Sequence, residues 1–134
     1  MKTLTQKEID IMIENHKHWI KKDCEGWEDM RADFNNAILE GVNFMRVNLE
    51  GANFVGANLR RANFEGANLV GADLSYAYLG YAKFNNTWLN YVDLSGADLR
   101  YADLSYADLR GADLSGACLS NINLEGASLE DTKF

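Results

Sequence analysis

Apolar and polar residues alternate with a five-residue period along most of the chain. In frames of five, twenty pentads run from Ala32 to Asp131 without an insertion or deletion, and a further frame begins at Thr132. The middle residue of the twenty-one frames is Leu in fifteen cases and Phe in six, and the residue two positions earlier is Ala in fifteen cases. So regular a repeat indicates that the repeating unit sets the fold.

Each pentad predicts a short strand-like side followed by a corner. In Ala97-Asp98-Leu99 the first and third side chains share a face, as alternate residues of a strand do, and the polar residue between them points outward. The next two residues of a pentad, such as Arg110-Gly111, are polar or turn-forming types that bend the chain toward the next side. A chain of such sides winds into a coil filled by Leu and Phe, so the predicted fold class is an all-β solenoid.

The pattern A-(D/N)-L-x-x over residues 32–134 resembles the pentapeptide repeat family. The resemblance implies a right-handed quadrilateral β-helix of about five coils with four pentads in each. Every fourth pentad then lies on the same side, which predicts two facing stacks of rings: Phe34 on Phe54, and Phe44, Phe64 and Phe84.

The last residue of each pentad forms the corner, and two residue types dominate there. Nine corners are Gly and five are Tyr, namely Tyr76, Tyr81, Tyr91, Tyr101 and Tyr106. Because a Tyr side chain is strained at positive φ, we expect two turn types, with positive φ at many Gly corners and negative φ at the Tyr corners.

Residues 1–31 precede the repeat and predict an α-helical cap and linker. Thr5 and Glu8 have the spacing of a capping box, and Leu4 and Ile9 that of a hydrophobic staple. One helical stripe contains Ile9, Met12, Ile13, His16 and Ile20. A solenoid exposes core side chains and strand edges at its first coil, so we expect the helix to cover that end, with His16 half-buried and Trp19 or Trp27 helping to close it.

The C-terminal end has no such helix. The last coil would leave four apolar residues uncovered: Leu119, Leu124, Leu129 and Phe134. An exposed apolar end favours a homodimer in which two identical ends cover each other, and the family resemblance implies the same. The alternative is that Phe134 folds over the end and the edge tolerates water.

Composition limits the remaining possibilities. The chain has 134 residues, a net charge of −7 and no apolar run long enough to span a membrane, so we expect one cytoplasmic domain without a membrane partner. Cys24 and Cys118 would lie at opposite ends of the rod and are expected to be free thiols, Cys118 being either reactive or inert.

No motif predicts an enzyme, a metal site or a cofactor. His16 and His18 point to different faces of a helix, and Glu14 could reach His18, but no third metal ligand is evident from the spacing. The glycines recur as corners and form no phosphate-binding loop. The repeated Asp residues occupy outward positions, where short side chains bind neighbouring backbone groups.

Two non-enzymatic functions remain. Quinolone-resistance members of the family imply double-stranded DNA mimicry directed at a type II topoisomerase such as DNA gyrase. The candidate acidic face consists of Asp33, Asp73, Asp93, Asp113 and, on an adjacent side, Asp108. These two sides would carry about one charge per ~3.4 Å, against one per ~1.7 Å in duplex DNA, so the mimicry would be partial.

The first choice is a protein-binding or scaffold module for an unknown protein partner, acting through exposed aromatic residues. The candidate surface consists of Tyr78, Tyr81, Trp88, Tyr91 and Tyr101. The alternative is that these rings stack at coil spacing and stabilise the solenoid. Direct nucleic-acid binding through Arg60, Arg61 and Arg100 is disfavoured by the negative net charge.

Overall fold

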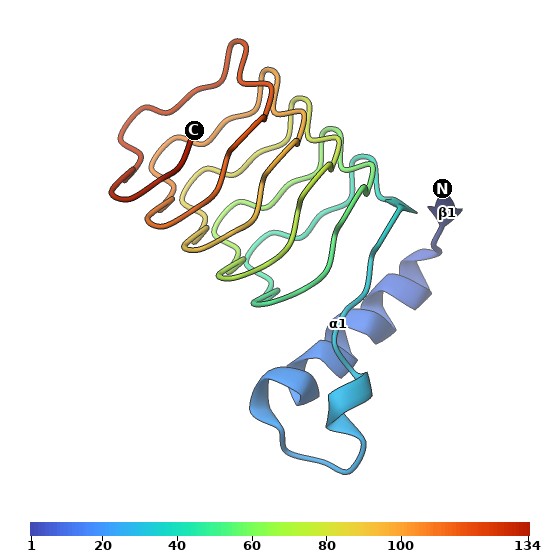
Figure 1. Ribbon diagram of the computed structural model, residues 1–134. Coiled ribbons are helices and arrows are strands. Elements are labelled where there is room, and N and C mark those ends of the chain that lie inside the picture. The colour runs from blue at the N-terminus through green and yellow to red at the C-terminus, as the bar shows by residue number, and fades with distance from the viewer.

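Residues twenty apart in the chain lie side by side throughout the repeat, so each coil holds four pentads. Parallel bridges join Asp33 to Asn53 and continue to the bridge between Asp113 and Lys133. The structure, a computed structural model, describes residues 1–134, and its coils stack regularly away from a helix at the N-terminal end (Figure 1). The regular elements are β1 (Lys2–Thr3), α1 (Gln6–Lys21), the 3-10 helix η1 (Trp27–Asp29) and β2 (Ala37–Ile38).

The bridged outward residues form four columns, and each column defines one side of the solenoid. The first side carries Asp33, Asn53, Asp73, Asp93, Asp113 and Lys133; the second carries Ile38, Asn58, Tyr78, Asp98 and Cys118. The third side carries Asn43, Asn63, Lys83, Asp103 and Asn123; the fourth carries Asn48, Asn68, Trp88, Asp108 and Ser128. The second and fourth sides are therefore opposite each other.

Backbone hydrogen bonds between successive coils hold the stack together. On the first side the Phe34 N–H donates to the Asn53 carbonyl at 2.7 Å, and the Asn53 N–H donates back to the Ala32 carbonyl at 3.0 Å. The corner N–H joins the ladder too, as when Asn36 donates to the Val55 carbonyl at 2.8 Å. Every coil except the last uses these N–H groups as donors to the next coil, which is consistent with the absence of proline from the chain.

Thirty-two buried apolar residues form one continuous core along the axis. The two predicted phenylalanine stacks are confirmed: rings of Phe34 and Phe54 lie 4.9 Å apart, and those of Phe64 and Phe84 also 4.9 Å apart. The stacks face each other edge to face, with Phe34 and Phe44 centroids at 5.7 Å. This geometry suits the charge distribution of aromatic rings, so the N-terminal half of the core has a fixed packing.

The prediction of two corner types is wrong. All twenty corner residues from Asn36 to Asp131 have positive φ, including Tyr81 at 61° and Tyr101 at 63°. Each corner is a β-turn whose third residue is left-handed, closed by a bond such as the one from the Ala37 N–H to the Phe34 carbonyl. Inter-coil bonds at every corner and contacts of the tyrosine rings with the next coil offset a strain of about 1–2 kcal/mol.

Helix α1 begins with the predicted capping box. The Thr5 hydroxyl accepts from the Glu8 N–H at 3.1 Å, while the Glu8 carboxylate accepts from the Thr5 N–H at 2.7 Å. The helix ends at Lys21, and Lys22 follows in the left-handed conformation. Neither this helix nor any other is long and apolar enough to cross a membrane.

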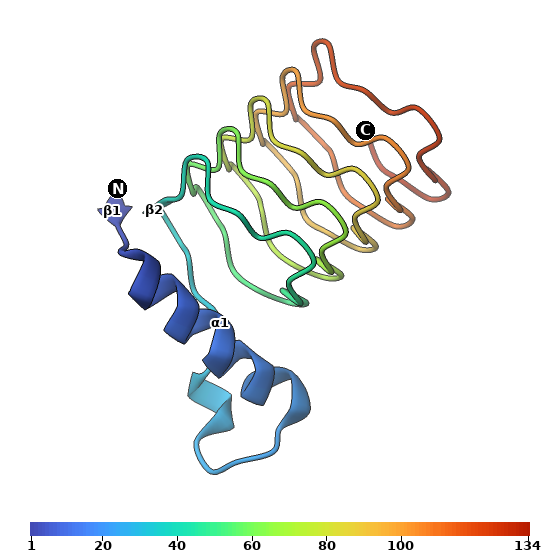
Figure 2. The same cartoon turned by 180° about the vertical axis from the view of Figure 1, so that it is seen from behind.

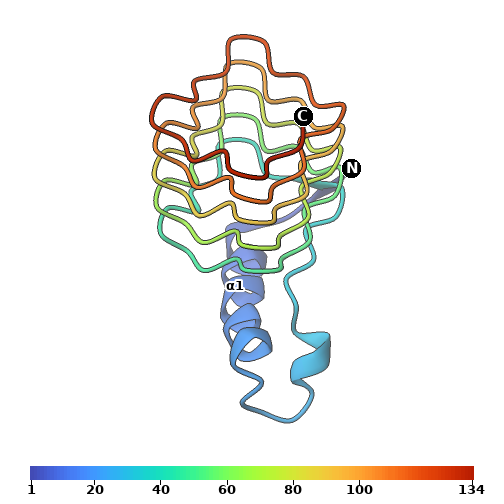
Figure 3. The same cartoon turned by 60° about the vertical axis from the view of Figure 1, so that its left-hand side comes forward.

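Helix α1 lies against the first coil, as the views in Figures 2 and 3 show. Ile9 belongs to the buried core, and Trp19 lies where a side chain at Gly51 would stand. His16 was expected to be half-buried, but it is fully buried. Its ring fits between two backbone groups of the first coil, which explains the difference.

The edge of the first coil also has a partner that the sequence did not predict. Strand β1 pairs in parallel with β2, placing Lys2 beside Ala37 and Thr3 beside Ile38. Such pairing protects an edge that would otherwise be open to other chains.

Candidate interaction surface

Arginine and tyrosine side chains gather on the second side of the solenoid and its adjoining corners. The Arg60 guanidinium lies 5.0 Å from the centre of the Tyr78 ring, and that of Arg61 lies 5.5 Å from the Tyr81 ring. The Tyr81 and Tyr101 rings are stacked, with centres 4.9 Å apart and planes 3° from parallel. We call Arg60, Arg61, Tyr78, Tyr81, Arg100 and Tyr101 the arginine–tyrosine surface.

The corners of successive coils create this cluster. Tyr81 and Tyr101 occupy the same corner one coil apart, so the ladder brings their rings into register. A groove of about 390 Å³ lies beside the stacked rings, lined by Arg60, Arg61, Gly80, Tyr81, Asp98, Arg100 and Tyr101. About half of each stacked tyrosine is exposed, 54% for Tyr81 and 51% for Tyr101. The rings are thus fixed by the fold and still accessible.

The surface has more cationic than anionic groups. Arg100 forms a bidentate pair with Asp98, with Nε–Oδ1 and Nη2–Oδ2 distances of 2.8 and 2.7 Å. That hydrogen bonding lowers the pKa of Asp98 and raises the pKa of Arg100. Arg61 reaches Glu40 at 3.3 Å, and Arg60 has no carboxylate partner within ion-pair distance. One arginine is therefore available to an anionic group of a partner.

The five predicted aromatic residues divide between two opposite sides. Tyr78, Tyr81 and Tyr101 come together on the second side, whereas Trp88 and Tyr91 lie on the fourth. The Tyr91 ring covers Gly111 of the next coil so closely that a Cβ there would lie 2.6 Å from it. Gly96 and Gly126 are covered in the same way by the tyrosines twenty residues earlier. Ring stacking along the corners, the alternative considered from the sequence, is therefore present.

The predicted acidic residues divide as well. Asp33, Asp73, Asp93 and Asp113 share the first-side column, in which Lys133 is the only basic residue, whereas Asp108 lies on the fourth side. The Arg110 guanidinium binds the Asp108 carboxylate and holds its pKa far below the usual range. Asp108 is thus already neutralised.

The aspartates of the first side also make structural hydrogen bonds. Oδ1 of Asp73 accepts from the Ser75 N–H at 3.0 Å, and Asp93 accepts from the Ser95 N–H at 2.9 Å. At Asp113 the Ser115 hydroxyl and N–H lower the pKa of the carboxyl. Asn residues at equivalent positions make the same bond, as Asn53 does to Val55. An amide oxygen can therefore replace the carboxylate oxygen in this bond, so the bond does not need the negative charge.

The C-terminal coil presents an open end. Leu119 and Leu124 are half-buried, while Leu129 is 38% and Phe134 63% exposed. The N–H groups of Leu119, Leu124 and Leu129 have no acceptor, although their counterparts in earlier coils donate to the next coil. Phe134 does not fold over the end.

Three potential metal ligands that the sequence pattern did not connect lie together at the C-terminal end of α1. Glu14 pairs with Lys17 at 2.9 Å and not with His18. The His18 ring instead lies 2.7 Å from an Asp23 oxygen, and Cys24 is close by. The spacing alone suggested no third ligand for His18; the left-handed Lys22 turns the chain back toward the helix and brings Asp23 and Cys24 close to it. The sequence signal that could have indicated this cluster is a His near the end of a helix, followed within six residues by Asp and Cys.

Comparisons with known proteins agree with the coil geometry. The model of the pentapeptide repeats family matches eight copies, over residues 30–66, 51–90, 77–116 and 107–134. No curated protein sequence is significantly similar to the chain.

Three solved structures illustrate the similarity. A pentapeptide repeat protein from the thylakoid lumen of Arabidopsis thaliana is 31% identical, with a TM-score of 0.59, and the match covers 69% of this chain and 61% of that one. A pentapeptide repeat protein from Nostoc PCC 7120 is 30% identical over 81% of this chain and 94% of its own, with a TM-score of 0.40. A plasmid-mediated fluoroquinolone resistance protein is 22% identical over 79% of this chain and 67% of its own, with a TM-score of 0.37.

The family match covers the whole repeat, and the twenty-residue coils, the Leu and Phe core and the small residues beside it account for the matched pattern. The chain belongs to the pentapeptide repeat family.

Proposed function

We propose that the chain is a non-enzymatic protein-binding module that contacts its partner through the arginine–tyrosine surface. The observation that carries this proposal is the parallel stack of Tyr81 and Tyr101 beside an arginine without an ionic partner, all in one exposed groove. Tyrosine and arginine are enriched in the residues that dominate binding energy at protein interfaces.

The chemistry of this surface fits an acidic partner segment. The protein as a whole carries a net charge of −7, so a local excess of arginine distinguishes this side from the rest of the molecule. Arg60 can bind a carboxylate of the partner, while the stacked rings of Tyr81 and Tyr101 can pack against apolar or aromatic side chains. Because the fold already fixes the rings, little conformational entropy is lost on binding.

The test is affinity capture with the full chain and a double variant, Tyr81→Ala with Tyr101→Ala, followed by measurement of affinity for the captured partner. Each alanine removes a ring from the groove, and the expected result is a loss of affinity of at least ~30-fold, as for a hot spot of about 2 kcal/mol. Tyr91→Ala on the opposite side is the matched control and should bind as the unmodified protein does. The proposal would be contradicted if the double variant bound the partner as tightly as Tyr91→Ala does.

A second candidate function is partial DNA mimicry directed at a type II topoisomerase such as gyrase. The first-side column favours it, because Asp73, Asp93 and Asp113 present three carboxylates at successive coils with no arginine among them. The spacing between adjacent strands is about 4.8 Å, which is wider than the charge spacing of duplex DNA.

Variants in which the first-side aspartates lose their charge can distinguish DNA mimicry from binding through the arginine–tyrosine surface. Asp73→Asn, Asp93→Asn and Asp113→Asn together remove three charges, and Asn keeps the turn, as it does at Asn53. If the column mimics DNA, the unmodified protein inhibits gyrase supercoiling and the triple variant does not. Inhibition that survives the triple substitution excludes the column as its cause.

A second copy of the chain is the partner we propose for the C-terminal end. The exposed Leu129 and Phe134 and the unpaired N–H groups of the last coil support a tail-to-tail homodimer that would cover both. Light scattering should give twice the chain mass of 15.0 kDa, and Leu129→Glu should restore the monomer. A monomeric mass for the unmodified chain at micromolar concentration would contradict the dimer.

We also infer that residues 1–31 act as a cap for a repeat domain over residues 32–134, wound right-handed as in the rest of the family. Pairing of β1 with β2 and the burial of His16 support the cap. A cytoplasmic location is proposed from the two free cysteines, which persist best in a reducing compartment.

A further inference from the structure

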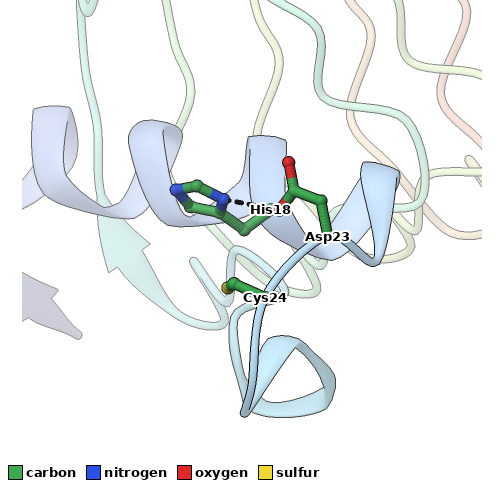
Figure 4. A group of neighbouring side chains, drawn as sticks. All are labelled: His18, Asp23 and Cys24. Atoms are coloured by element: carbon green, nitrogen blue, oxygen red, sulfur yellow. Dashed lines mark hydrogen bonds and ion pairs between the residues drawn. The ribbon is translucent and has the colours of Figure 1, made fainter.

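The end of α1 and the turn that follows it bring three different metal-ligating groups together. His18 lies in the last turn of the helix, and Asp23 and Cys24 follow its left-handed end residue, Lys22. Their donor atoms all lie within 4.8 Å of one another, and Figure 4 shows the three side chains converging. A sulfur, a ring nitrogen and a carboxylate oxygen are the donor types that zinc takes in proteins.

We propose that His18, Asp23 and Cys24 bind a single zinc ion. With zinc–ligand bonds of about 2.0 Å to nitrogen and oxygen and about 2.3 Å to sulfur, tetrahedral donors stand roughly 3.3–3.5 Å apart. The His18 and Asp23 donors, now 2.7 Å apart across a hydrogen bond, need to separate slightly, and Cys24 needs to move inward. All three side chains are partly exposed, so small rotations achieve this.

The three side chains leave the fourth ligand position of a tetrahedral ion to water. Sδ of Met30 lies 3.8 Å from Sγ of Cys24, so the thioether shields one face of the thiol. Three protein ligands with one open position describe a zinc site that exchanges its fourth ligand.

The local charges balance a divalent cation. On binding, the Cys24 thiol releases its proton to solvent. The proton that His18 Nδ1 donates to the Asp23 carboxylate in the metal-free protein must also leave Nδ1, and the bound neutral ring carries its proton on Nε2. Two metal–ligand bonds then replace the hydrogen bond between His18 and Asp23. The thiolate and the Asp23 carboxylate then neutralise the two positive charges of the ion. Of the neighbouring lysines, Lys22 has its ammonium group over the Trp27 ring, 5.2 Å from the ring centre.

The ion would tie the end of α1 to the segment that leads into the first coil. Figures 1–3 show this turn projecting beyond the coils, so the ion would reach it directly from solvent. Since a metal that binds only the folded form stabilises it, zinc is expected to raise the melting temperature of the protein.

Cobalt binding to the reduced, metal-free full chain tests the site, because a cysteine thiolate bound to Co²⁺ gives a charge-transfer absorption. We expect this band in the unmodified protein, its displacement by Zn²⁺, and its loss in Cys24→Ser. Cys118→Ser is the matched control, since it removes the only other thiol and should leave the band intact. His18→Gln and Asp23→Asn should each weaken zinc binding by ~10-fold or more.

Several results would overturn the proposal. These are no band at cobalt concentrations far above that of the protein, a band that depends on Cys118, or unchanged zinc affinity in both His18→Gln and Asp23→Asn. Circular dichroism and melting of the metal-free variants show that each is folded before its affinity is compared. If Cys24→Ser fails to fold, Cys24→Ala replaces it as the variant without the thiol.

Discussion

Acidification should weaken the attachment of α1 to the first coil through His16. The buried ring accepts the Ala32 N–H at Nδ1, at 3.0 Å, and donates from Nε2 to the Glu50 carbonyl, at 2.8 Å. Only the neutral imidazole with its proton on Nε2 can make both bonds. Burial lowers the pKa of His16, with Arg31 lowering it further, and the Glu50 carbonyl opposes the shift only partly.

The direction of the effect follows from this lowered pKa. As pH falls, the unfolded chain binds a proton at this histidine before the folded protein does, so the free energy of unfolding decreases. The stabilisation is fully present above the unfolded pKa of about 6.5 and is lost as pH falls through the lower pKa of the folded state. Protonation puts a hydrogen on Nδ1 and leaves the Ala32 N–H without an acceptor, which costs about 1–3 kcal/mol.

Urea unfolding followed by circular dichroism, at about pH 8 and about pH 5, measures this loss, and NMR of the ring protons gives the pKa of His16. His16→Leu should be less stable at the higher pH and should lack most of the decrease. His18→Gln is the control, because it removes the other histidine and should keep the decrease. The reasoning fails if His16 titrates at or above about 6.5, or if His16→Leu retains the full pH dependence.

Two further substitutions test the corners and the core by denaturant unfolding. The new Cβ in Gly71→Ala meets no atom within 4 Å, so this variant should lose only about 1–2 kcal/mol of unfolding free energy, from left-handed backbone strain. Gly111→Ala must also displace the Tyr91 ring and should lose about 1 kcal/mol more. Equal losses in the two variants would show that the contact between the ring and Gly111 does not contribute to stability. Leu79→Ala opens a cavity at a fully buried position and should cost about 2–5 kcal/mol, so a loss below 1 kcal/mol would contradict the close-packed core.

The inward-facing half of the structure could be predicted because the apolar pattern determines which two residues of each pentad point into the core. A Leu or Phe every five residues with a small residue two before it fits a coil, and equal spacing of the phenylalanines puts Phe34 on Phe54 once the coil is known. The repeat pattern does not determine how many sides each coil has. The value of four came from the family resemblance, and it agrees with the bridges between residues twenty apart in the chain.

The corner tyrosines show where local rules fail. Positive φ is unfavourable for Tyr101 considered alone, yet its N–H donates to the Ser120 carbonyl at 3.0 Å and its ring stacks on Tyr81. Every neighbouring corner imposes the same backbone, so cooperation along the stack outweighs the preference of one residue. The conformational preference of a single tyrosine does not include this cooperation between neighbouring corners.

The zinc-binding candidate depended on a turn that the sequence did not specify. His18 and Cys24 are six residues apart, and they meet only because Lys22 takes the left-handed conformation at the end of α1. The division of the aromatic residues was predictable in principle: with four pentads in a coil, Tyr78 and Trp88 are two pentads apart and must lie on opposite sides.

Tyr78 offers a way to separate binding from stability. Asn58 and Asp98, one coil before and one coil after it in the same column, each accept the N–H two residues further on, at 3.3 and 3.2 Å. Tyr78 cannot do so, and the Gly80 N–H makes no hydrogen bond within the protein. This side of the coil therefore lacks the hydrogen bond to the Gly80 N–H, and it has instead an exposed tyrosine ring beside Arg60.

Tyr78→Asn should restore that bond. One additional hydrogen bond contributes about 0.5–1.5 kcal/mol, which offsets the loss of the contact between Arg60 and the ring, so unfolding should show equal or higher stability. Partner affinity should fall at the same time, because the ring no longer forms part of the arginine–tyrosine surface. If instead stability drops by more than about 1 kcal/mol while affinity is unchanged, Tyr78 serves the solenoid and not a partner.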